Sequence, residues 1–126
     1  MSMRTPLGRV RGLGSAKEGV HHWWTQRLTA VALIPLTLWF VASLVQLAGA
    51  DLAHVTAWIA QPVVAVLLML LFASGFYHLA LGMQVVIEDY VHGEPARIVT
   101  LVLVRFACWL LAAIALFSVL KIAFRG

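Results

Sequence analysis

A histidine within a long apolar stretch is the residue best suited to chemistry in this sequence. His78 stands eleven residues before Asp89, where a helix is expected to leave the membrane. Eleven helical residues rise roughly 17 Å, so the imidazole lies near the middle of a hydrocarbon core about 30 Å thick. Ionisable side chains at that depth are costly and usually functional. The pattern predicts an axial ligand to a haem iron; the alternative is an interhelical hydrogen bond worth about 0.6 kcal/mol.

Small residues share the helical face of His78. Ser74 and Gly75 precede it by four and three residues, and Gly82 follows it by four, and positions at these offsets are neighbours on a helix. Their small side chains would leave room beside the imidazole for a flat macrocycle. The alternative is that they let another helix approach closely, as small-xxx-small patterns do.

The other histidines indicate a partner chain. They are expected at or near the membrane surfaces, and they are His21, His22, His54 and His92. A haem held between two imidazoles would therefore take its second ligand from a different polypeptide. Because three helices also enclose a cofactor poorly, we expect an obligate membrane partner.

The end of the His78 helix carries groups that suit a quinone. Asp89 and Tyr90 are expected at the cytoplasmic interface, and Asp89 shares a helical face with His78 because eleven residues make nearly a whole number of turns. A carboxylate is unfavourable at a helix C-terminus, which hints at another role. A hydroxyl donor and a proton-exchanging carboxylate beside an apolar pocket fit a ligand that takes up two electrons and two protons. The alternatives are an aromatic membrane anchor and a solvated charge.

Aromatic and basic residues precede the first apolar segment on the same side. Trp23 and Trp24 are typical membrane anchors, and Arg27 can extend its charged end to the interface. The functional interpretation is that Arg27 and His21 pair with haem propionates or a quinone headgroup, because carboxylates at the membrane edge need a cationic partner. The residues alone leave both interpretations open.

The composition restricts the fold to a membrane protein. The 126 residues are 63% hydrophobic and 11% charged, whereas soluble domains carry about 25% charged residues, and so small a chain cannot bury this much apolar surface in water. The nine Lys and Arg flank apolar segments, which indicates membrane topology and no nucleic-acid partner. The single cysteine, Cys108, permits no intrachain disulfide and is interpreted as a packing residue.

Three apolar segments are each long enough to span a bilayer, which takes about 20 residues. We expect an all-α membrane protein with three transmembrane helices, at about 23–49, 56–90 and 96–123. Pro62 favours a helix start within the second segment, whose extra length fits an interfacial lead-in, and Gly93 and Pro95 predict the turn before the third. Residues 21–126 then form the membrane domain, after a cytoplasmic segment at 1–20.

The basic residues predict the orientation. Six lie in the N-terminal segment up to Arg27 or in the second loop, against two at the C-terminus, so the N-terminus is expected in the cytoplasm. The first apolar segment begins too late for a signal peptide, and the short lead favours a bacterial cytoplasmic membrane over a mitochondrial transit peptide. Arg105, one or two turns inside the third helix, is expected to extend to the cytoplasmic interface.

Two stretches resemble a known family. Residues 78–90, HLALGMQVVIEDY, resemble the signature of the small hydrophobic anchor (D subunit) of succinate dehydrogenase: a histidine, a glycine four residues on, and Asp-Tyr eleven and twelve residues on. Residues 19–30, GVHHWWTQRLTA, resemble the stretch before that family's first helix. The length and the three-helix layout agree, so the resemblance covers nearly the whole chain. His22 departs from the pattern, because some relatives have an aspartate there.

The resemblance implies a non-catalytic anchor subunit of respiratory complex II. Its partners would be a flavoprotein that oxidises succinate, an iron–sulfur subunit and a second membrane anchor of the cytochrome b type. The two anchors would form halves of a heterodimeric helical bundle, share one haem b and help to form the ubiquinone site. His78 would supply one ligand to the haem iron, and Tyr90 would donate to a quinone carbonyl oxygen beside Asp89. Arg27 and His21 match residues near the quinone pocket and the haem propionates.

Two other functions remain open. The chain could be the anchor of a fumarate reductase or another quinone-linked dehydrogenase, which its co-purifying soluble subunits would reveal. It could also be a small oligomeric transporter with His78 in a polar pathway. Self-association without soluble partners and without haem absorbance would favour the transporter.

Overall fold

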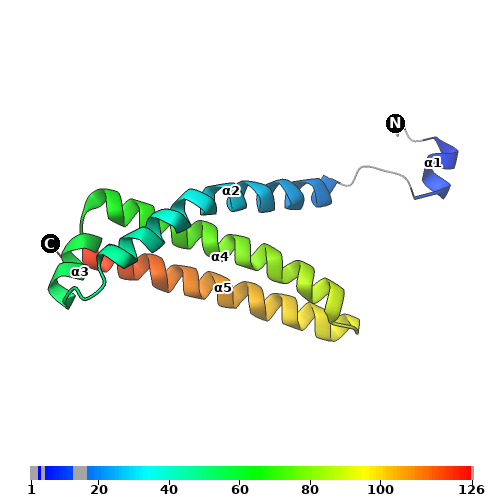
Figure 1. The fold of residues 1–126 in the computed structure, drawn as a ribbon. Coiled ribbons are helices and arrows are strands. Elements are labelled where there is room, and N and C mark those ends of the chain that lie inside the picture. Colours follow the sequence, from blue (N-terminus) through cyan, green and yellow to red (C-terminus); the bar gives the residue numbers. More distant parts are fainter. Residues whose placement is uncertain (1–2, 4, 13–16, 126) are drawn as a thin grey trace.

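The long apolar segments form helices. The computed structural model describes residues 3, 5–12 and 17–125, and all regular elements within them are helices (Figure 1). In chain order they are α1 (Pro6–Val10), α2 (Lys17–Gln46), α3 (Leu52–Ile59), α4 (Pro62–Tyr90) and α5 (Glu94–Ala123). Three of them, α2, α4 and α5, are long and apolar enough to cross a membrane. The predicted all-α fold with three transmembrane helices is confirmed.

The N-terminal segment contains helix that the sequence did not predict. In α1, the Thr5 hydroxyl caps the first turn by accepting the backbone N–H of Gly8 at 3.1 Å. α2 begins at Lys17 instead of about residue 23 and so crosses the predicted boundary at 20/21. No proline interrupts the chain between Pro6 and Pro35, so the backbone ladder can extend into the polar residues that precede the apolar run. Residues 1–2, 4 and 13–16 of the predicted segment lie outside the described residues.

The second apolar segment forms two helices. Asp51 caps α3, since its carboxylate accepts the backbone N–H of His54 at 2.8 Å. The chain turns after Ile59, and α4 begins at Pro62, whose missing N–H suits the first turn of a helix. Pro62 is therefore confirmed as the start marker, and the membrane-spanning helix begins six residues later than the expected position of about 56.

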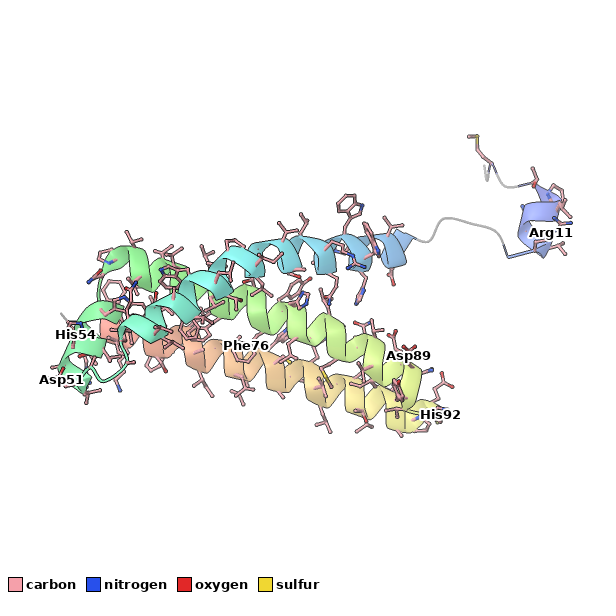
Figure 2. The ribbon with its side chains drawn as sticks, in the orientation of Figure 1. Arg11, Asp51, His54, Phe76, Asp89 and His92 are labelled. Carbon is pink, nitrogen blue, oxygen red and sulfur yellow. The ribbon has the colours of Figure 1, made fainter. Side chains whose placement is uncertain are left out.

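α4 is the central helix of the bundle. It runs beside α5, is crossed by α2 on another side, and contacts α3, which also packs on α5 (Figure 1). Gly93, with φ of +100°, makes the turn between α4 and α5, a backbone conformation that residues with a Cβ rarely adopt. Figure 2 shows Asp89 and His92 at this turn, and Asp51 and His54 at the opposite end of the bundle.

The tightest packing lies at the α3 end of the bundle. A buried apolar cluster there consists of Val64, Ala65, Leu68 and Val119. The rings of Trp39 on α2 and Trp58 on α3 stack beside this cluster with centroids 5.9 Å apart. Because α3 lies across the ends of α4 and α5, its stacked tryptophan joins α2 to the α4–α5 pair.

The outer surface of the bundle is apolar. Leu38 on α2 is 68% exposed, and Leu103 and Phe117 on α5 are 64% and 66% exposed. Contiguous exposed apolar surface of this kind marks contact with lipid or with another protein. This chain alone therefore leaves a large apolar surface for lipid or another protein to cover.

Arg105 lies deeper than expected. It stands eleven residues after the start of α5 at Glu94, roughly 17 Å or three turns along the helix, where one or two turns were expected. Its Nη2 donates to Gln84 Oε1 on α4 at 2.9 Å, and Gln84 Nε2 donates to Glu88 Oε1 at 2.9 Å. The guanidinium thus extends toward the α4–α5 turn, and its partner there is the side-chain amide of Gln84 on α4.

Candidate functional site around His78

The imidazole of His78 lies between α4 and α2, half-buried. Its Nδ1 is 2.9 Å from the hydroxyl oxygen of Thr29, and its Nε2 is 3.4 Å from the side-chain nitrogen of Gln26. Both partners belong to α2. The interhelical hydrogen bond that stood as the alternative for this residue is therefore present, and it involves one nitrogen at short distance and the other at long distance.

The hydroxyl of Thr29 is placed to accept a hydrogen bond from His78 Nδ1. Its oxygen also lies 2.9 Å from the Thr25 carbonyl oxygen and 3.0 Å from that of Gln26, so backbone acceptors are available for its single hydrogen. When the hydrogen is donated to the backbone, the same oxygen can accept from an Nδ1–H group of His78. In that tautomer Nε2 keeps its lone pair, the form in which imidazole binds metals.

A polar stripe on α2 faces α4. Residues His22, Gln26 and Thr29 are spaced by four and three positions, which places them on one side of the helix. Among the described residues, His22 Nε2 and Gln26 Oε1 are buried atoms with no hydrogen-bond partner. The stripe was not predicted from the sequence, because α2 carries other polar residues such as Thr25, Arg27 and Thr37 that hide its spacing.

A shallow apolar groove opens beside the imidazole. Its volume is about 440 Å³, and the residues that line it are Ala30, Leu33, Ile34, Thr37, Leu38 and His78. All but His78 belong to α2. The ring therefore borders an open apolar surface on one side and the polar stripe on the other.

Gly75 and Gly82 permit α2 to approach α4. A Cβ built on Gly75 would lie 3.8 Å from Leu33 Cδ2, and one on Gly82 would lie 3.7 Å from Gln26 Nε2. Side chains of α2 thus occupy the space next to both glycines. Within this chain, the two glycines therefore allow close helix packing, which was the alternative to leaving room for a macrocycle.

A substitution series at Gly75 tests this packing. The 3.8 Å contact leaves room for one methyl group, so Gly75→Ala should leave thermal stability nearly unchanged. Gly75→Leu should destabilise the assembly by roughly 1–3 kcal/mol, because the larger side chain overpacks the contact with Leu33. Thermal denaturation of the solubilised protein measures both; equal stability of the alanine and leucine variants would contradict the close approach.

The predicted quinone residues stand at the exposed end of α4. Tyr90 is the last residue of α4 and is 78% exposed, and Asp89 beside it is exposed as well. The backbone carbonyl oxygen of Tyr90 lies 3.0 Å from His92 Nδ1. The phenol and the carboxylate are thus both accessible, at the α4–α5 turn shown in Figure 2.

The predicted cationic residues of α2 do not join the His78 cluster. Arg27 is exposed, and its guanidinium carbon lies 5.4 Å from the centroid of the Trp23 ring. His21 is also exposed, and its backbone carbonyl oxygen accepts the Thr25 hydroxyl at 2.7 Å. The stacked Arg27 and Trp23 fit the anchoring interpretation, and the side chains of Arg27 and His21 are both accessible to a group from outside this chain.

Comparison with known proteins assigns the family. A family model described as the succinate dehydrogenase/fumarate reductase transmembrane subunit matches residues 1–120. The chain belongs to this family. Its recognition from residues 78–90 and 19–30 is thereby confirmed.

Relatives within the succinate dehydrogenase/fumarate reductase transmembrane subunit family match most of the chain. A succinate dehydrogenase hydrophobic membrane anchor subunit of Rickettsia bellii is 33% identical over 119 residues, which cover 94% of this chain and 87% of the relative. The protein of the same name in Paracoccus denitrificans is 30% identical over 117 residues, or 93% and 90% of the two chains. A succinate dehydrogenase membrane anchor subunit of Reclinomonas americana is 34% identical over 100 residues, or 71% and 77%.

Family membership and the three spanning helices together identify a multi-pass membrane protein. The roles of His78, Arg27, His21, Tyr90 and Asp89 are predictions from the sequence.

Proposed function

We propose that this chain is the membrane-anchor subunit of a succinate dehydrogenase, and that it has no succinate-oxidising activity on its own. The observation that carries this proposal is the match to relatives with that name over 93–94% of the chain. The relatives favour succinate dehydrogenase over fumarate reductase, although the family description includes both. The anchor would dock a flavoprotein and an iron–sulfur subunit at the membrane.

The surroundings of His78 fit a haem b shared with a second anchor subunit. Thr29 lies 2.9 Å from Nδ1, the Nδ1–H tautomer would leave the Nε2 lone pair for the iron, and an open apolar groove borders the ring. The 3.4 Å contact from Gln26 is long for a hydrogen bond and would give way to iron. A bound haem would supply one-electron redox chemistry. Within this chain, His78 would bind the iron and α2 would orient the ring.

Two side chains near the N-terminal end of α2 would bind polar groups at the edge of the same assembly. Arg27 and His21 are exposed near the N-terminal end of α2 and would pair with haem propionates or the quinone headgroup. In this chain the guanidinium of Arg27 is held over Trp23, which keeps it at the interface. The pairing therefore requires no deep burial of a charge.

The end of α4 would contribute to a ubiquinone site. The Tyr90 hydroxyl would donate a hydrogen bond to a quinone carbonyl oxygen, and the carboxylate of Asp89 would hold or release a proton at the same boundary. Both side chains are exposed where α4 ends. A bound quinone also needs walls, which the second anchor and the iron–sulfur subunit would provide.

The distribution of charges supports a bacterial cytoplasmic-membrane location with the N-terminus in the cytoplasm. The α4–α5 turn, with Asp89, Tyr90 and Arg97, would then lie on the same side as the soluble subunits. The α3 end, capped by Asp51, would face the other side.

Purification of the intact assembly tests this function. The affinity-tagged chain, solubilised gently from its native membrane, should bring down a flavoprotein, an iron–sulfur protein and a second small membrane subunit. The preparation should also show low-spin haem absorbance and succinate:quinone reductase activity. A colourless preparation that contains only copies of this chain would overturn the proposal and support the transporter alternative.

A further inference from the structure

We propose that Thr29 is a positioning residue for the haem ligand: its hydroxyl accepts the Nδ1 proton of His78, which directs Nε2 to the iron and makes it a stronger donor. This inference rests on the proposed function, because it assumes that His78 binds haem. It assigns a role to α2 that is distinct from membrane anchoring.

One arrangement keeps the bond of Thr29 to its own backbone. The Thr29 hydrogen goes to the carbonyl oxygen of Thr25 or Gln26, the Thr29 oxygen accepts from His78 Nδ1, and the Gln26 amide nitrogen approaches Nε2. With the proton on Nε2 instead, Thr29 would have to give up its backbone acceptor to donate to Nδ1, and the Gln26 amide would have to turn its oxygen toward Nε2. The Nδ1–H form gives the Thr29 hydroxyl and both ring nitrogens a partner, while Gln26 Oε1 stays without one in the described part of the chain.

Among the polar side chains that contact the His78 ring, Thr29 is the closest. Its 2.9 Å contact with Nδ1 is shorter than the 3.4 Å contact of Gln26 with Nε2. The groove walls on the other side are Ala30, Leu33, Ile34 and Leu38, together with Thr37 about two turns further along α2. Because Thr29 is itself fixed to the α2 backbone, the helix transmits its position directly to the imidazole.

A hydrogen bond at the remote nitrogen changes how an imidazole binds metal. An acceptor for Nδ1–H raises the basicity of Nε2 and fixes the plane of the ring, and loss of such a partner typically lowers metal affinity 10–100-fold. A stronger donor favours ferric over ferrous iron. Without the hydroxyl, the haem should therefore bind less tightly and its midpoint potential should become more positive.

Three variants of the intact, purified complex test the proposal. Thr29→Val keeps the shape and removes the acceptor, and Thr29→Ser restores the hydroxyl. Thr25→Val removes a hydroxyl one turn away, which bonds to His21 and not to His78. For each variant we would measure haem content, the electron paramagnetic resonance g-values of the low-spin ferric haem, and its midpoint potential by optical redox titration.

Thr29→Val should reduce haem affinity roughly tenfold or more, shift the g-values and raise the midpoint potential, whereas Thr29→Ser and Thr25→Val should match the unmodified complex. Wild-type g-values and potential in Thr29→Val would overturn the inference even if haem remained. His78→Ala separates the two proposals: if it retains the low-spin spectrum, the ligand assignment itself fails, and if it loses the spectrum while Thr29→Val is unchanged, only the role of Thr29 fails.

Discussion

Replacement of His78 by alanine should abolish the low-spin haem spectrum of the assembled complex. The imidazole borders an open apolar groove, and if Nε2 binds the iron, loss of the ring would leave the haem with the ligand of the partner subunit alone. A single axial imidazole gives a different spectrum from two, and haem held this way is easily lost. Absorbance spectra of the reduced and oxidised complex measure the change.

His54→Ala is the matched control. His54 is an exposed histidine on α3 at the opposite end of the bundle (Figure 2), and its known contact is through its backbone N–H to Asp51. This variant should keep the full spectrum. An unchanged spectrum in His78→Ala would show that the imidazole serves only as the interhelical bridge to Thr29 and Gln26.

Tyr90→Phe should reduce quinone reduction roughly 100-fold, the lower end of what a positioned proton donor contributes. The substitution removes one hydroxyl from an exposed position at the helix end and leaves α4 packing untouched, because the ring is 78% exposed. Succinate oxidation with an artificial acceptor should continue at the normal rate. The ratio of the two activities in the purified complex is the measurement.

Tyr77→Phe provides the comparison at the other tyrosine. Tyr77 lies on α4 beside Arg105 and Trp109, well away from the helix end, so both activities should stay normal. If Tyr90→Phe also retained both activities, Tyr90 would be an aromatic anchor of the membrane interface and nothing more.

The sequence predicted the three spanning helices because their signals are local. Long uncharged runs set the helices, Pro62 set a start and Gly93 set a turn, each through a property of one residue or one segment. The start of α2 and the separate helix α3 were missed. The ends of these helices depend on capping side chains, such as the carboxylate of Asp51, and on where prolines are absent. A run of apolar residues does not show either feature.

The site was predictable in part for the same reason. His78 was found because a titratable side chain is conspicuous among apolar residues. Thr29 and Gln26 were not found, because a threonine and a glutamine are tolerated in many membrane helices and gain meaning only when α2 is laid against α4. The distance of Arg105 from the start of its helix was underestimated, because α5 begins at Glu94, before the apolar residues of the third segment.

The row of side chains from Arg105 through Gln84 to Glu88 has a consequence for biogenesis. A lone arginine near the centre of a spanning helix costs about 2.5–3.5 kcal/mol on insertion, but here its acceptor lies on the preceding helix of the same chain, and that acceptor is in turn bonded to a carboxylate. The two helices can therefore leave the insertion machinery together as a hairpin in which the guanidinium already has an acceptor. In a newly inserted chain, the arginine would therefore already be hydrogen-bonded before the partner subunits bind.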